Sequence, residues 1–239
     1  MRNRRAGLTL MEVLVAISLL SLLSVGILTA LRVAASAWER ANASLMLDRR
    51  IAVANGIFYA ALENVAPVYA EAAQSTQPGM ASSFVFLFFQ GEPQAMRFVT
   101  GYSLRGGPRG GLRLMELAVV DGPRGKRVLL NERPYGGPRA AGALVSSVVP
   151  EPAGGTRLFF APIEPQPASF VIADELAGCS FSYLLQRAPG QPGTWTTMWQ
   201  QPALLPSAVS IQMSPREETA RLRPVTVTAP VRSKLRPLG

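Results

Sequence analysis

Residues 4–31 read RRAGLTLMEVLVAISLLSLLSVGILTAL, two arginines and a glycine followed by a long apolar run. From Leu8 to Leu31, Glu12 is the only charged residue. At about 1.5 Å of rise per residue, a helix of this length crosses the roughly 30 Å hydrocarbon core of a bilayer. Beyond Glu12 its polar residues are small hydroxyls that can hydrogen-bond back to helix carbonyls: Ser18, Ser21, Ser24 and Thr29. The run therefore predicts a transmembrane helix over residues 8–31.

The charges that flank this run predict its orientation. Arg2, Arg4 and Arg5 precede it, whereas Arg32 is the only basic residue close behind it. The positive-inside rule then keeps the N-terminus in the cytoplasm and sends the remainder across the membrane. An ordinary secretory signal has an apolar region of about 7–15 residues followed by its cleavage site. Here the apolar region is longer and the glycine precedes it, so the segment is a poor match to such a signal.

The stretch resembles the leader of type IV pilin-like prepilins: a short basic leader, Gly7, and then Leu8-Thr9-Leu10-Met11-Glu12. The resemblance implies that a membrane prepilin peptidase removes residues 1–7 by cutting between Gly7 and Leu8. It also implies N-methylation of the new terminal residue, Leu8. Family members more commonly have phenylalanine there, and leucine keeps the position apolar.

Glu12 would be the fifth residue of the mature chain, where the family has its glutamate. The resemblance implies that the Glu12 carboxylate meets the terminal amine of a neighbouring subunit during assembly. Two such charges neutralise each other in a low-dielectric setting, where pairing matters far more than in water. Alternatively, Glu12 reaches the headgroup region at the cytoplasmic interface. The two interpretations can apply at different stages.

Composition bounds the remaining chemistry. The chain has 239 residues, a net charge of +9, one cysteine (Cys179) and no histidine. A single cysteine excludes an intrachain disulfide, and the lack of histidine excludes His-based triads and most zinc sites. We therefore expect no enzymatic activity, no cofactor and no metal site. The length suits the membrane helix followed by one sizeable domain or two small subdomains.

The helix is predicted to continue through residues 32–66 as an amphipathic segment. Between residues 34 and 65 there is no proline, and Pro67 supplies a stop. Apolar residues recur at three- and four-residue spacing on one face: Leu47, Ile51, Ala54, Phe58, Ala61 or Leu62, and Val65. This stripe is expected to be covered by the domain that follows.

The residue pattern of 67–230 is typical of a β-rich domain. Short apolar runs are broken by glycine and proline, at 83–89, 96–104, 111–121, 126–132, 157–163, 169–176, 179–185, 194–199, 205–213 and 223–231. A polar linker is expected at 74–79, a long loop at 134–155 and a disordered basic tail at 231–239. The predicted fold is therefore α+β and pilin-like, a long N-terminal helix packed on antiparallel sheets.

Six segments of this domain resemble the J-type minor pseudopilin of type II secretion. Three are similar to its middle: GEPQAMRFVTGYSL (91–104), GGLRLMELAVV (110–120) and RVLLNERPY (127–135). Three are similar to its end: LAGCSFSYL (176–184), GTWTTMW (193–199) and LPSAVSIQM (205–213). The resemblance implies a pseudopilus tip subunit in the bacterial inner membrane, with its domain in the periplasm. Its implied partners are I- and K-type minor pseudopilins, the major pseudopilin and the prepilin peptidase. The alternatives are a minor pilin of a type IV pilus and a membrane-anchored periplasmic enzyme.

Residues 105–139 contain eight basic residues against three acidic ones. They could form a phosphate-binding face, but most lie beside glycine or proline and few aromatic residues alternate with them. We therefore favour solvated turn charges over nucleic-acid binding. The run GGPRGG at 106–111 lacks the lysine and hydroxyl ending of a phosphate loop and is expected to be a turn. The acidic pairs 174–175 and 217–218 are expected at exposed edges, and Trp195 and Trp199 as core or subunit-contact anchors.

Overall fold

The computed structural model describes residues 9–77, 80–104, 111–151, 155–186, 188, 190–216 and 224–232. The expected cleavage site, Gly7 and Leu8, lies outside the described residues, as does most of the expected tail. The chain divides into two compact units, Met1–Arg49 and Arg50–Gly239, and each is described by itself.

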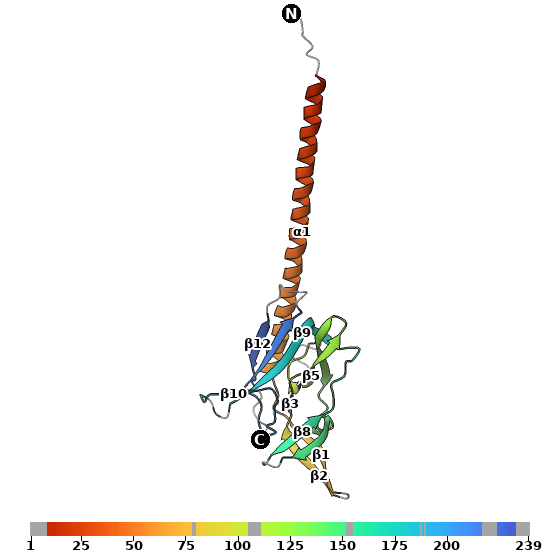
Figure 1. Cartoon of the computed structure of the whole chain (residues 1–239). Coiled ribbons are helices and arrows are strands. Elements are labelled where there is room, and N and C mark those ends of the chain that lie inside the picture. The colour runs from red at the N-terminus through yellow and green to blue at the C-terminus, as the bar shows by residue number, and fades with distance from the viewer. Residues whose placement is uncertain are drawn as a thin grey trace, which may run out of the picture. The chain divides into compact units, whose positions relative to one another are not determined.

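A single helix, α1 (Leu10–Glu63), begins in the first unit and ends in the second (Figure 1). It ends at Glu63, three residues before the predicted end at residue 66. Val65 instead forms an antiparallel bridge with Thr100, because Pro67 disfavours helical backbone at the residue before it. In the first unit the described side chains of α1 are exposed or, at Ser36, half-buried.

The second unit is built on an eight-stranded antiparallel sheet with the order β12-β11-β9-β6-β5-β4-β3, and β10 pairs with β9 beside this path (Figure 1). Its strands are β3 (Phe89–Gly91), β4 (Ala95–Thr100), β5 (Arg113–Gly122), β6 (Gly125–Pro134), β9 (Phe170–Leu185), β10 (Thr194–Thr196), β11 (Ala208–Pro215) and β12 (Val225–Pro230). Two hairpins form separate two-stranded sheets: β1 (Tyr69–Gln77) with β2 (Met80–Leu87), and β7 (Val145–Pro150) with β8 (Thr156–Phe160). A short helix, α2 (Pro138–Gly142), precedes β7.

The main core lies between the C-terminal part of α1 and one face of the large sheet. Phe58, Ala61 and Leu62 of α1 are buried against this face. The sheet contributes alternate residues of its strands, including Met96, Phe98, Met115, Leu117, Val128, Leu130, Phe181, Val209 and Ile211. Burial of each large side chain contributes about 1.5–3 kcal/mol. This helix-on-antiparallel-sheet arrangement confirms the predicted α+β, pilin-like fold class.

A second core forms on the two hairpins and α2. Its buried residues include Ala70, Ala72, Phe86, Phe88 and Ala141, and Val99 and Leu114 join it from the large sheet. Because Val99 and Leu114 alternate with residues of the main core, they belong to the opposite face of β4 and β5. The large sheet is therefore covered on both faces at β4 and β5.

Three expectations about this domain were wrong. The expected linker at 74–79 falls within the β1–β2 hairpin, and the expected loop at 134–155 contains α2 and β7. The runs 169–176 and 179–185 belong to one strand, β9, which continues through Ala177 and Gly178.

The large sheet closes back on itself at its β3 edge. An isolated bridge joins Gly91 of β3 to Trp199, which follows β10. Trp199 N–H donates to the Gly91 carbonyl over 2.7 Å, and Phe181 N–H of β9 donates to the Pro93 carbonyl over 2.8 Å. The rings of Phe89, Tyr183 and Trp199 pack edge-on in the space that results.

Candidate functional site

The first turn of α1 is organised around Thr9 and Glu12. The Thr9 hydroxyl accepts a hydrogen bond from Glu12 N–H over 3.3 Å, and the Thr9 carbonyl accepts from the same N–H over 3.1 Å. Thr9 therefore caps the helix, since its side-chain oxygen satisfies a backbone donor that has no partner within the helix. The spacing Thr-x-x-Glu is that of a capping box, which marks a helix start in a sequence. This signal was not used in the sequence analysis.

Glu12 itself is exposed in the first turn of α1. A carboxylate there lies near the positive end of the helix dipole, which stabilises it by about 0.3–1 kcal/mol at exposed sites. This interaction gives the single charge in the apolar run a physical reason within one subunit. It leaves the carboxylate oxygens accessible to a further partner.

The hydroxyl side chains of the apolar run bond back to the helix, as predicted. Ser18, Ser21 and Ser24 each donate to the carbonyl four residues earlier over 2.8 Å, and Thr29 does so over 2.7 Å. Within the described residues, Leu10–Glu39 is long and apolar enough to cross a membrane, and it is not buried by the protein. A helix whose polar groups are internally satisfied is suited to lipid. This segment fits a single-pass membrane anchor.

The comparison with protein families agrees with this geometry. Residues 2–28 match the family model described as the prokaryotic N-terminal methylation motif. This motif is the signal of type IV pilin-like prepilins, so the chain carries a prepilin signal in front of an α+β, pilin-like fold. The motif implies processing by a prepilin peptidase and assembly with other pilin-like subunits. No curated protein matches the chain significantly.

In the second unit, polar contacts hold the end of α1 to strand β12. Tyr59 donates its hydroxyl hydrogen to the Thr228 carbonyl over 2.6 Å. Arg232, two residues after β12, donates its N–H to the Leu62 carbonyl over 3.2 Å. One edge of the large sheet is therefore tied to the helix that carries the membrane segment.

The basic residues of 105–139 are largely paired. Among the described residues, six of the eight lie within 4 Å of a carboxylate: Arg113, Arg124, Lys126, Arg127, Arg133 and Arg139. Arg105 and Arg109 lie outside the described residues, as does most of the 106–111 stretch, where a turn was expected. Carboxylates that occupy guanidinium groups compete with phosphate, which supports the choice against a nucleic-acid face.

The acidic pair 174–175 participates in this pairing and is half-buried, where an exposed edge was expected. Asp174 accepts two hydrogen bonds from Arg127, and Glu175 pairs with Arg124. Burial raises the pKa of Asp174, but hydrogen bonds from Arg127 and the Glu175 N–H outweigh it and lower that pKa below its usual value. Residues 217–218 lie outside the described part of the chain.

A buried charge network was missed by the sequence analysis. Arg97 of β4 is 2 % exposed and pairs with Glu116 of β5 over 2.8 Å. The same guanidinium donates to the carbonyls of Ala161 and Pro162, over 2.7 and 3.1 Å, and Arg133 also pairs with Glu116. Because a buried charge is costly unless it is paired and hydrogen-bonded, the network fixes the β8–β9 connection onto the sheet.

The remaining reactive groups point to structural roles. Burial raises the pKa of Cys179 to about 12, so its thiol is neutral at physiological pH. Within the described ranges, no group of three or more His, Cys, Asp or Glu residues is placed to hold a metal. Trp199 is buried in the main core and donates its ring N–H to the Leu204 carbonyl over 3.0 Å, whereas Trp195 is 46 % exposed.

Proposed function

We propose that this chain is a structural assembly subunit, a J-type minor pseudopilin at the tip of a type II secretion pseudopilus. It would act through subunit contacts, without catalysis, together with I- and K-type partners in the export of folded proteins. The observation that carries the proposal is a prepilin motif on an exposed apolar helix that continues into the core of a β-rich domain. The downstream segments 91–104, 176–184 and 205–213 support the J-type assignment by resemblance.

We further propose that maturation cuts between Gly7 and Leu8, that Leu8 is N-methylated, and that Glu12 pairs with the terminal amine of a neighbour. Residues 8–31 would lie in the inner membrane, 32–66 would extend the helix, and 67–230 would form the periplasmic domain.

Mass spectrometry of the chain from native membranes tests the processing step. We expect a mature N-terminus at methylated Leu8, loss of maturation in Gly7→Ala, and normal cleavage with impaired assembly in Glu12→Val. An intact Met1 in the wild-type chain would contradict prepilin processing, on which the whole proposal depends.

Co-purification of residues 38–239 with cognate I- and K-type domains tests the tip assignment. A stable ternary complex supports it. Failure with every cognate partner, together with a twitching or transformation defect on deletion, would assign the chain to a type IV pilus instead.

A further inference from the structure

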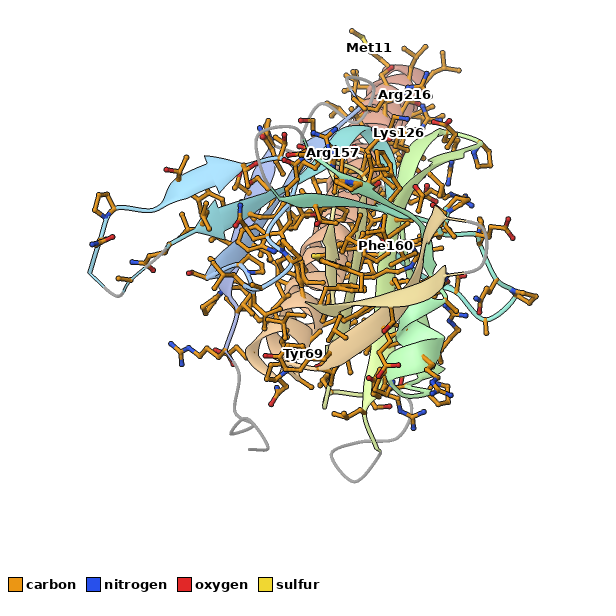
Figure 2. The ribbon with its side chains drawn as sticks, turned by 90° about the horizontal axis from the view of Figure 1, so that it is seen from below. Met11, Tyr69, Lys126, Arg157, Phe160 and Arg216 are labelled. Atoms are coloured by element: carbon orange, nitrogen blue, oxygen red, sulfur yellow. The ribbon has the colours of Figure 1, made fainter. Side chains whose placement is uncertain are left out.

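A pocket of about 270 Å³ lies between two strand edges of the second unit. Five consecutive residues of β8, 156–160, line one side, and Figure 2 labels Arg157 and Phe160 within this stretch. Residues 89–92 and 198–202 line the other side. The pocket is therefore bordered along one wall by the length of a strand.

Among the described residues, no strand pairs with the edge of β8 that faces away from β7. Glu151 N–H donates to the Gly155 carbonyl at the start of the hairpin, so hydrogen-bonded pairs with β7 fall at every second residue from there. The N–H and C=O groups of Thr156 and Leu158 consequently point away from β7. In the part of the chain that the structure describes, β8 pairs with β7 alone. An open edge of this kind is a template for one more strand.

Apolar side chains are exposed at the pocket. Phe159 of β8 is 45 % exposed and Met198 is 42 % exposed, and both line it. Phe89 and Trp199 form its buried wall. An occupant with an apolar side chain would remove this surface from water, which favours binding.

The charge left without a partner at the pocket is negative. Glu92 lines it and accepts a hydrogen bond from Gln90 over 2.7 Å, but no described cation lies within ion-pair distance of its carboxylate. The cation at the pocket, Arg157, is already paired with Glu151 over 2.7 Å. A complementary occupant therefore carries a lysine or arginine.

We propose that this pocket binds an extended segment of a second pilin-like subunit, which adds to β8 as a strand. The segment places an apolar side chain at Phe159 and Met198 and a basic side chain beside Glu92. Backbone pairing supplies affinity and the two side-chain positions supply specificity. The class of partner rests on the proposed function, because assembly is what brings another subunit against this domain and covers its open edge.

Photo-crosslinking in cells that make the native partners tests the inference on the full chain. The probe, p-benzoylphenylalanine, replaces Phe159, and the adduct is identified by mass spectrometry. We expect an adduct with a chain that carries the same N-terminal motif, through a segment with an apolar residue near a lysine or arginine. Tyr69 is a matched control, because it is 63 % exposed, does not line the pocket and is labelled apart from β8 in Figure 2. Absence of an adduct at Phe159, or the same adduct at Tyr69, overturns the proposal.

A third probe position separates this inference from the proposed function. Trp38 on α1 is 75 % exposed in the first unit, so the probe there reports helix contacts between subunits. Adducts with pilin-like chains at Trp38 but not at Phe159 leave the assembly role standing and overturn the pocket proposal. Adducts at neither position overturn both.

Two variants then test the mechanism of binding. Thr156→Pro removes an outward N–H while the bonds to β7 remain, and Thr156→Val keeps that N–H at similar size. We expect at least tenfold fewer Phe159 adducts in Thr156→Pro and wild-type yield in Thr156→Val. If Thr156→Pro lowers the unfolding midpoint, Glu92→Lys replaces it, with the same loss expected. A wild-type yield of Phe159 adducts in Thr156→Pro, or in Glu92→Lys where it replaces that variant, overturns the proposal.

Discussion

At the scale of single residues, Thr9 and Glu12 show how a charge is accommodated in an apolar helix. The carboxylate lies in the first turn, where the backbone N–H groups and the helix dipole favour it, and the Thr9 hydroxyl takes the N–H of Glu12. The position of Glu12 followed from the sequence. The Thr-x-x-Glu spacing would also have predicted that Thr9 caps the helix at this position.

We expect Thr9→Val to loosen this helix start. Loss of a threonine cap costs about 1 kcal/mol, which corresponds to roughly fivefold faster exchange of the Glu12 amide. Hydrogen exchange of the full chain in detergent micelles measures this. Thr29→Val is the control, because the Thr29 hydroxyl donates to a carbonyl and satisfies no backbone N–H. Equal exchange rates of the Glu12 amide in both variants would show that the Thr9 cap does not stabilise the helix start.

Gly91 is a second single-residue case, because a Cβ atom at this position would disturb the packing of the β3 edge. A Cβ there would lie 2.7 Å from the Trp199 Cβ and 2.8 Å from the Tyr183 Cζ. We expect Gly91→Ala to lower the free energy of unfolding by about 1–3 kcal/mol, because the β3 edge could no longer close on Trp199. Urea unfolding of the chain measures the loss. Gly178→Ala on β9, where a Cβ meets nothing within 4 Å, should change it little. A wild-type midpoint for Gly91→Ala would contradict the close approach.

At the scale of elements, the strands rich in large apolar residues were predicted and those without them were missed. The runs in β5 and β6 contain Leu, Met and Val at successive positions and were found. β1, YAEAAQSTQ, is mostly alanine and polar residues, and its pairing with the phenylalanine-rich β2 makes it a strand. Such tertiary pairing overrides weak local propensity. The α2–β7 stretch was hidden by its glycine and proline content.

The buried network around Arg97 was unpredictable for a different reason. An arginine within MRFVT reads as a solvent-facing residue of a half-exposed strand, and only the covering of both sheet faces makes it buried. We expect Arg97→Met to cost about 3–5 kcal/mol in unfolding free energy, because Glu116 keeps Arg133 but loses its closest buried partner.

The control for Arg97→Met is Arg139→Met, since the Arg139 side chain is 94 % exposed and its pair with Glu71 spans 3.7 Å. That loss should stay within about 1 kcal/mol. The double variant Arg97→Met/Glu116→Met should recover part of the loss, because it removes the charge left behind. Similar costs for the two single variants would argue against a structural role of the buried network.

At the scale of the whole molecule, α1 divides between two physical environments. Its N-terminal part has an apolar surface that the protein leaves exposed, and its C-terminal part contributes Phe58, Ala61 and Leu62 to the main core. Periodicity and length predicted both parts. The division of the chain near Arg49 could not be read from a helix pattern that runs on without interruption.

Two truncations test this division. Residues 50–239 retain the buried face of α1 and should unfold cooperatively in urea. Residues 64–239 lack Phe58 and Leu62, each worth about 1.5–3 kcal/mol, against a total stability of about 5–15 kcal/mol for a typical domain. We expect the shorter chain to aggregate or to lose its cooperative transition, seen by circular dichroism. A cooperative transition in 64–239 would show that the sheet does not need the helix.

The hydrogen bonds that join α1 to β12 have a mechanical consequence. Tyr59 and the Leu62 carbonyl meet strand-side partners at Thr228 and Arg232, next to the apolar contacts of Phe58. Tension applied along α1 would therefore be shared between the covalent connection into β1 and these contacts with the β12 end of the sheet.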